Sequence, residues 1–259
     1  MAFGVERRGG LFHVWRENIP AGESSVTRAE IVKRVKGIIL KHAAPVRIWL
    51  YGSEASGEAS PTADIDIAFE DPAFHDLEKI RQEVEALPTL VKVDVTNLAF
   101  CEPRFQQRVR DTGKVLYSAT KELRFEDALY NFQRALEAFE SVYKRKEEFR
   151  THGFGDVFLD ILVKRFEFTY EMSWKVLKRY LDFVGIGALN PRSCFREAYQ
   201  QGLLQDESVW LEMIEQRNLS AHEYNEQEIA RLLEKAGRYL DAFEDLYRKL
   251  ETKHQEMRS

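Results

Sequence analysis

The chain has 259 residues, of which 31% are charged, and its formal net charge at pH 7 is -5. This charge argues against a protein that binds nucleic acid mainly by electrostatic attraction, because neutralising phosphates requires a clustered excess of Lys and Arg. The two cysteines, Cys101 and Cys194, are isolated and predict neither a disulfide framework nor a zinc site. No apolar run approaches the roughly 18 residues needed to cross a bilayer, and the first residues lack the apolar stretch of a secretory signal. We therefore expect a soluble protein of the reducing cytoplasm, with no membrane partner and two domains.

The first half of the chain mixes helix and strand patterns. A helix is predicted from about residue 27, where Thr27 and Glu30 have the spacing of a capping box. Three runs predict strands, the first because it is apolar on both faces and the others because apolar and polar residues alternate: VRIWLYG (46–52), DIDIAFE (64–70) and VKVDVTNL (91–98). We predict an α+β domain, a mixed sheet with helices, over residues 1–119.

The second half is dominated by helical periodicity. Helices are predicted over residues 122–148, 157–184, 193–201, 207–221 and 226–254. Long helices with short connections favour an all-α antiparallel bundle, here over residues 120–259. Phe166, Tyr170 and Trp174 recur every four residues, which indicates packing in the bundle core more often than a surface for stacking bases.

Two carboxylates stand at alternate positions of the second predicted strand. Asp64 and Asp66 are two residues apart, so their side chains leave the same side of a strand. Asp94 has a matching position in the third predicted strand, and three carboxylates converge if these strands are neighbours. Such like charges raise one another's pKa unless a cation neutralises them, and Mg²⁺ prefers oxygen ligands. The pattern therefore predicts a Mg²⁺ site suited to a nucleoside triphosphate.

A glycine and a serine directly follow the first predicted strand. Gly52 allows the backbone to approach an anion closely, and the hydroxyl of Ser53 can donate to a phosphate oxygen. Taken singly, this pair is also typical of an ordinary turn, and a single D-x-D is typical of a solvated sheet face. The order of strand, Gly-Ser turn, D-x-D and third aspartate favours triphosphate binding.

On these residues the chain resembles the minimal nucleotidyltransferases, or MNT domains, of the DNA polymerase β superfamily. Their signature is Gly-Ser, ten residues and Asp-x-Asp, and here Gly52-Ser53 is followed by residues 54–63 and then by Asp64-Ile65-Asp66. The resemblance implies that ATP is the substrate. It implies that the catalytic metal ligands are Asp64, Asp66 and Asp94. It also implies that Gly52 and Ser53 contact the nucleotide. It also implies nucleotidyl transfer with release of pyrophosphate, in which Asp94 accepts the proton of the attacking hydroxyl.

Two positions depart from the pattern of many members of that family. Glu54 stands where they have Arg, and Ala63 stands where they have Ser. An acid beside a triphosphate turn is unfavourable unless its side chain points away, because like charges repel. Ala63 removes a capping hydroxyl but no metal ligand.

The run RNLSAHEY, residues 217–224, gathers residue types that carry chemistry. On a continuous helix Arg217 and Tyr224 share a face, whereas His222 lies about 140° further round. Arg offers a permanent fork for phosphate and His transfers protons near neutral pH, so the pair suits RNA cleavage without a metal. The simpler interpretation is that Arg217 and His222 pair with acids of the bundle and that Tyr224 packs.

Over nearly its whole length, the second half resembles HEPN-fold proteins that serve as substrate-binding partners of nucleotidyltransferases. The resemblance rests on LYNFQRALEAFE, RFEFTYEMSWKVLKRYL, NPRSCFREAYQQGLL and VWLEMIEQRNLSAHEYNE, the last of which carries the R-x4-H-x-Y signature as Arg217, His222 and Tyr224. In that relationship the HEPN protein is an RNase-like toxin and the MNT protein is its antitoxin, which transfers AMP to the tyrosine of the signature. The resemblance therefore implies transfer to Tyr224 of the same chain or of a second chain, since HEPN domains commonly form homodimers. Fusion of the two domains favours such transfer through a high effective concentration.

Two alternatives stay open at this stage. A small nucleotidyltransferase domain followed by a helical domain is also the arrangement of aminoglycoside adenylyltransferases, which would modify a small hydroxylated molecule. In the other alternative, the chain is an RNase toxin that cleaves RNA through Arg217 and His222 and is restrained by its own first domain.

Overall fold

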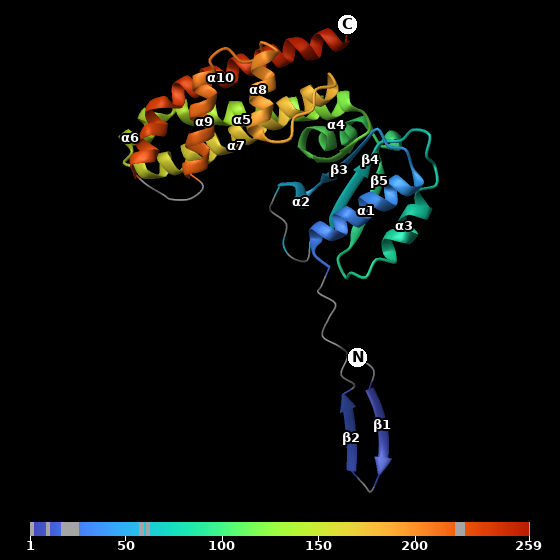
Figure 1. The fold of residues 1–259 in the computed structure, drawn as a ribbon. Helices are drawn as coiled ribbons and strands as arrows, with labels where there is room; N and C mark the ends of the chain where they lie inside the picture. Colours follow the sequence, from blue (N-terminus) through green and yellow to red (C-terminus); the bar gives the residue numbers. More distant parts are fainter. Residues whose placement is uncertain are drawn as a thin grey trace. The chain divides into compact units, whose positions relative to one another are not determined.

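The computed structural model describes residues 3–8, 11–16, 26–56, 60, 63–220 and 226–258. The chain divides into two compact units, Met1–Leu116 and Tyr117–Ser259. Figure 1 shows that the sheet belongs to the first unit and that helices make up the second. Within the described ranges, no helix combines the length and the apolar character needed to cross a membrane.

The first unit is built on a mixed four-stranded sheet with the strand order β5-β4-β3-β6. The strands are β3 (Arg47–Tyr51), β4 (Ile65–Phe69), β5 (Val93–Asn97) and β6 (Lys114–Ser118), the last of which crosses the division between the units. β3 pairs with β4 in antiparallel fashion, whereas β4 and β5 are parallel. β3 therefore lies between two strands, which agrees with a run that is apolar on both faces.

Helices flank this sheet, and the first of them begins where the sequence predicted a helix. They are α1 (Arg28–His42), the short α2 (Ser53–Ser56), α3 (Leu77–Glu85), the 3-10 helix η1 (Leu98–Phe100) and α4 (Pro103–Thr112). The hydroxyl of Thr27 accepts a hydrogen bond from the Glu30 amide over 3.3 Å, which confirms the predicted cap. A separate hairpin, β1 (Phe3–Arg8) paired with β2 (Leu11–Arg16), was not predicted.

The core of the first unit fixes the two strands that carry the aspartates. Ile65, Ile67 and Phe69 of β4 are fully buried, as the alternating pattern predicted. Because these residues anchor one side of β4 in the core, the alternate side chain of Asp66 is directed to the other side. The apolar residues of the D-x-D strand thus set the direction of its acid.

The second unit is helical in its described part. Its helices are α5 (Lys121–Lys144), α6 (Lys146–Thr151), α7 (Gly155–Phe183), α8 (Pro191–Gln200), α9 (Glu207–Ser220) and α10 (Glu226–Arg258). α5 and α7 pack along each other, and α10 contacts both. Phe166 and Tyr170 are buried and Trp174 is half-buried in this core, so the prediction that this aromatic run packs is confirmed.

The predicted single helix over 122–148 is wrong in one respect. It is two helices, α5 and α6, and Arg145 between them leaves helical geometry with φ −89° and ψ 8°. The Arg145 amide donates to the carbonyl of Val142 over 3.1 Å, an i to i−3 bond that tightens the last turn of α5 and ends it.

Candidate functional site

The aspartates of the D-x-D motif meet Asp94 at one end of the paired strands β4 and β5. Asp66 and Asp94 are partners in the parallel register, and Asp64 directly precedes β4. The ammonium group of Lys92 spans two of these carboxylates, 2.7 Å from Asp94 Oδ2 and 3.3 Å from Asp64 Oδ2. The prediction that these two strands are neighbours is therefore confirmed, and Lys92 links Asp64 to Asp94 at this end of them.

The electrostatics of this end of the sheet favour a bound cation. The pKa of Asp66 is raised, first because the carboxyl loses hydration and then because Asp94 and Asp64 repel its charged form. Lys92 opposes that shift and has a raised pKa itself, since it donates to Asp94 and Asp64. Among the described residues, no three His, Cys, Asp or Glu side chains are gathered closely enough to hold a metal ion. In this arrangement Lys92 supplies the positive charge between Asp64 and Asp94.

Gly52 brings the end of β3 against the Asp66 carboxylate. Its φ of 72° lies in the left-handed region, and a Cβ added there would fall on Oδ2 of Asp66. Glycine is required at this position both for its backbone conformation and for this close approach. Ser53 follows as the exposed first residue of α2. The predicted Gly-Ser turn and the D-x-D strand therefore touch each other directly.

The two positions that depart from the MNT pattern meet at one arginine, Arg28 of α1. Its guanidinium donates to Glu54 Oε2 over 2.8 Å and to the carbonyl oxygen of Ala63, also over 2.8 Å. The side chains of Arg28 and Glu54 are 24% and 20% exposed, so water screens this ion pair only in part. Arg28 thus neutralises the acid beside the turn and holds the residue that immediately precedes Asp64.

A cavity of about 440 Å³ opens beside the glycine turn. It is lined by Tyr51, Gly52, Asp66, Arg108, Val109 and Thr112. Arg108 belongs to α4, is exposed, and lies over the ring of Phe105 at 5.1 Å. Sequence reasoning missed this cation, although Pro103 at the first turn and the i, i+4 spacing of Phe105 and Val109 are signals of a helix there. The cavity combines an acid, a tight turn and a cation suited to phosphate.

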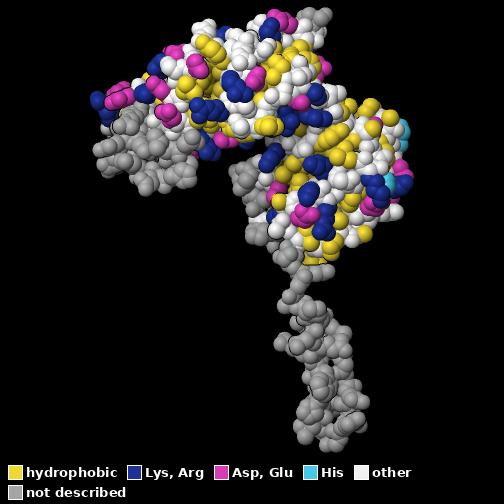
Figure 2. Space-filling model, in the orientation of Figure 1, with side chains coloured by type: hydrophobic (Ala, Val, Ile, Leu, Met, Phe, Trp, Pro, Cys, Tyr) yellow, Lys and Arg dark blue, Asp and Glu magenta, His cyan; other side chains and the backbone are white. Residues whose placement is uncertain are grey.

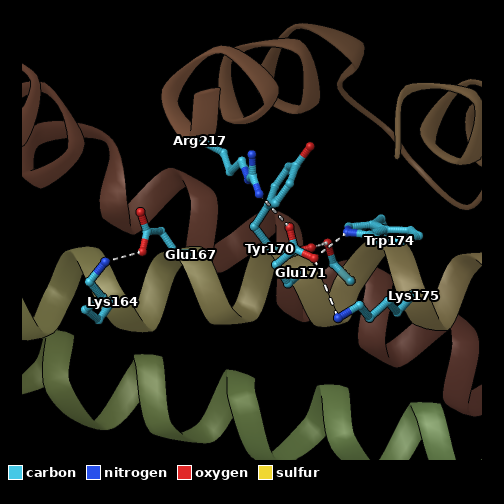
Figure 3. Close-up of polar contacts among 8 residues, drawn as sticks. Lys164, Glu167, Tyr170, Glu171, Trp174, Lys175 and Arg217 are labelled. Atoms are coloured by element: carbon cyan, nitrogen blue, oxygen red, sulfur yellow. Dashed lines mark hydrogen bonds and ion pairs between the residues drawn. The ribbon is translucent and has the colours of Figure 1, made fainter. Parts of the chain in front are cut away.

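In the helical unit, Arg217 extends from α9 toward α7 and contacts Glu171. Figure 3 shows the two side chains pointing toward each other, and their closest atoms are 3.3 Å apart. Glu171 also accepts from the indole nitrogen of Trp174 over 3.0 Å and pairs with Lys175 at 3.6 Å. Burial raises the pKa of the neighbouring Tyr170 to about 12, and the charge of Arg217 opposes that rise. The structure therefore places the first residue of the R-x4-H-x-Y run in a polar cluster between two helices.

The other two residues of that run, His222 and Tyr224, lie outside the described residues. The grouping of Arg217 with His222 and Tyr224 therefore stays a prediction from the sequence alone.

Two family matches cover most of the chain. Residues 33–122 match the family described as "Polymerase beta, Nucleotidyltransferase". Residues 127–252 match the family described as "Nucleotidyltransferase substrate binding protein like". The first match contains the Gly-Ser turn and all three aspartates, and the second contains the Arg217 cluster.

Individual relatives match the chain in part. A protein of Haemophilus influenzae named "Probable ribonuclease HepT" is 37% identical over 70 residues, which are 25% of this chain and 48% of that protein. The chain thus spans about half the length of this curated relative. Two solved structures are each matched over 98% of their own length. One is from Thermus thermophilus, with 28% identity over 46% of this chain and a TM-score of 0.40. The other is from Haemophilus influenzae and is described as a substrate-binding domain of a nucleotidyltransferase, with 24% identity over 48% of this chain and a TM-score of 0.43.

Proposed function

We propose that this chain, which joins a polymerase-β-type nucleotidyltransferase domain to a nucleotidyltransferase substrate-binding domain, transfers AMP from ATP to a hydroxyl group presented by its helical part. The observation that carries the proposal is the packing of the Gly52 turn against Asp66, beside Asp94. A tight turn against paired carboxylates serves to hold a triphosphate above the acids that assist its reaction. We assign this role to residues 1–119 and the presentation of the acceptor to residues 120–259, an HEPN-like bundle.

In this proposal, the backbone of Gly52 and the hydroxyl of Ser53 bind the triphosphate, and Arg108 adds a permanent positive charge at the same cavity. Asp94 accepts the proton of the attacking hydroxyl. The hydroxyl oxygen forms a bond to the α-phosphorus, the bond between that phosphorus and the bridging oxygen breaks, and pyrophosphate leaves with the electron pair. The acceptor gains AMP and no oxidant or reductant is needed.

The oxygen donors of the three carboxylates suit Mg²⁺, and binding would draw them together around the ion. Their oxygen atoms are hard ligands. The pKa of Asp66 is raised first by burial and then by the charges of Asp94 and Asp64, and a divalent cation would relieve that repulsion. Asp64, Asp66 and Asp94 would hold the ion, with Lys92 withdrawing from its place between Asp64 and Asp94. When bound, Mg²⁺ supplies charge stabilisation for the phosphate oxygens.

The best candidate for the acceptor is Tyr224, in the same chain or in the second chain of a homodimer. This choice rests on the R-x4-H-x-Y run and on the partial similarity to the HepT protein.

The two cysteines, both free thiols, agree with action in a reducing cytoplasm.

Labelling with ATP carrying a tagged α-phosphate, followed by mass spectrometry, tests the proposal. In the presence of Mg²⁺ the full chain should gain an AMP adduct on Tyr224. The adduct should be lost in Tyr224→Phe, in the double variant Asp64→Asn, Asp66→Asn, and on adding EDTA. Tyr130→Phe, which alters an exposed tyrosine of the same unit, is the matched control and should label normally. An adduct that persists in the double aspartate variant would refute the assigned site.

Ribonuclease activity is a second candidate function, favoured by two observations. Arg217 is held by Glu171 in a polar cluster, and the curated relative that matches part of this chain is named a probable ribonuclease. We assign phosphate binding to Arg217 and proton transfer to His222 in this candidate. RNA cleavage by purified protein that disappears in His222→Ala and grows in the double aspartate variant would support it. Equal cleavage by His222→Ala and the unmodified chain would reject it.

A further inference from the structure

A second cavity lies wholly within the helical unit, between α8 and α9. Its volume is about 330 Å³, at the lower end of the range for pockets that bind small molecules. Its floor is aromatic, since Phe195 and Trp210 are buried and their ring centroids lie 4.9 Å apart. In the view of Figure 2, hydrophobic and basic side chains lie next to one another over these two helices. The cavity is therefore an apolar recess with charge at its rim.

Three polar side chains stand at that rim. Arg192 and Tyr199 come from α8, and Glu207 begins α9; all three are exposed. Arg196, the other basic lining residue, already contacts Glu197 at 3.4 Å. Among the described residues, by contrast, no hydrogen bond or ion pair engages the side-chain charge of Arg192 or Glu207. A cation and an anion are thus available on opposite helices of the same cavity.

This arrangement selects the chemistry of a ligand. The guanidinium of Arg192 suits a phosphate, and the carboxylate of Glu207 suits an amino or hydroxyl donor. Arg192 lies on α8 and Glu207 on α9, so a ligand that contacts both needs its anion and its donor at different ends. The aromatic floor between them suits a planar, largely apolar ring. A zwitterionic amino acid fits less well, because its two charges sit on one carbon.

We infer that the cavity between α8 and α9 is a binding site for a nucleoside monophosphate. The base lies on the floor formed by Phe195 and Trp210, its amino group donates a hydrogen bond to the Glu207 carboxylate, and the phosphate binds Arg192. The site is separate from the cavity beside Gly52, and its occupancy does not depend on the proposed transfer reaction.

Photolabelling of the full chain with 8-azido-AMP in EDTA tests this site, because mapped peptides report where the nucleotide binds. We expect crosslinks within residues 191–214. In calorimetry, AMP should bind at least tenfold more tightly than adenosine, which lacks the anion, or inorganic phosphate, which lacks the ring. Arg192→Ala should weaken AMP binding about tenfold, Glu207→Gln should weaken it less, and Arg179→Ala, an exposed arginine of α7 outside the cavity, should leave it unchanged.

Several results would overturn the inference. These are crosslinks confined to the sheet-containing unit, equal binding of adenosine and AMP, and tighter binding of phenylalanine than of AMP. Arg192→Lys guards against a folding artefact, because it keeps the charge and should retain more AMP affinity than Arg192→Ala. Loss of AMP transfer to Tyr224 without loss of these crosslinks would count against the proposed transferase alone.

Discussion

Gly52 lies where the end of β3 touches the Asp66 carboxylate, so its replacement combines two effects. Gly52→Ala forces an L residue to a φ of 72°, a strain of about 1 kcal/mol, and drives its Cβ into Asp66. We expect Asp66 to be displaced and nucleotidyl transfer to fall about 100-fold or more, since misplacement of a catalytic group by about 1 Å has that effect. The rate of AMP transfer and the free energy of unfolding should both be measured.

Gly185→Ala is the matched control for this prediction. Gly185 has a φ of 84°, but a Cβ there meets nothing within 4 Å, so the variant carries the strain without the collision. It should lose about 1 kcal/mol of stability and keep its transfer rate. A Gly52→Ala variant as active as Gly185→Ala would show that the close approach to Asp66 is dispensable.

Arg28 supports the turn that Gly52 forms. Arg28→Ala leaves the Glu54 carboxylate half-buried without its ion-pair partner and releases the carbonyl of Ala63. We expect ATP binding, measured by calorimetry with Mg²⁺, to weaken about fivefold, because an unpaired anion then faces the triphosphate. That change corresponds to about 1 kcal/mol, the size expected for a charged hydrogen bond at a partly exposed site.

A charge-neutral partner variant distinguishes repulsion from general damage. Adding Glu54→Gln to Arg28→Ala should restore most of the ATP affinity. Lys41→Ala removes an exposed ion pair with Glu83 from the same helix α1 and should leave ATP binding unchanged. ATP affinity that is equal in Arg28→Ala and in the unmodified chain would reject this role for Arg28.

The sequence predicted the central residues of the first site but not those that surround them. The Gly-Ser turn, D-x-D and Asp94 follow from strand periodicity and short spacing, which are local features. Arg28 meets Glu54 and Ala63 across 26 and 35 residues, and Arg108 reaches the cavity from a helix that was not predicted. Contacts at such separations depend on how elements pack, which a single sequence does not specify.

At the scale of elements, Asp206 ties the start of α9 to α10. Its carboxylate accepts from the amide and the hydroxyl of Ser208 over 3.0 and 2.6 Å, and from Arg238 of α10 over 2.9 Å. These bonds, that of Ser208 foremost, lower the pKa of Asp206 to about 2. The unfolded chain has an ordinary aspartate pKa of about 3.9. The carboxylate therefore stabilises the fold above about pH 4, and this contribution is lost as the pH falls toward 2.

Urea unfolding followed by helical circular dichroism measures this contribution. The unmodified chain should be more stable than Asp206→Asn at pH 5, and the difference should shrink to near zero by about pH 2. Asp241→Asn, at an exposed position of α10, is the control and should not reproduce that pH dependence. A stability difference that grows on acidification would contradict the assignment.

The long helices near the end of the chain were predicted well, and the elements that were missed are short. The predicted helices over 157–184, 207–221 and 226–254 correspond to α7, α9 and α10 within a few residues. The helix predicted from 193 begins at Pro191, because Asn190 forms a capping box with Ser193 that periodicity does not reveal. The hairpin, α4 and β6 were missed, although Gly9-Gly10 between two strand-like runs is a hairpin signal. Short elements offer few residues over which a period can be recognised.

At the scale of the whole molecule, the joining of the two domains predicts how transfer depends on concentration. A tethered acceptor experiences an effective concentration in the millimolar range, about 10³ above that of a chain dissolved at about 1 µM. The labelling rate per chain should therefore stay constant when the protein is diluted tenfold, whether transfer occurs within one chain or within a stable homodimer. A rate proportional to protein concentration would exclude both routes.

Mixing unmodified chains with a mass-tagged chain that carries Asp64→Asn and Asp66→Asn separates these two routes. The tagged chain cannot label itself, but it retains Tyr224 as an acceptor. If transfer occurs within one chain, the tagged chain stays unlabelled even when both forms are produced together. If transfer crosses a homodimer, tagged chains that are produced together with unmodified chains become labelled, at a rate that dilution does not change. Tagged chains that are added later become labelled only as fast as the dimers exchange subunits. The pattern of labelling thus reports whether each acceptor is served by its own carboxylates or by those of a partner.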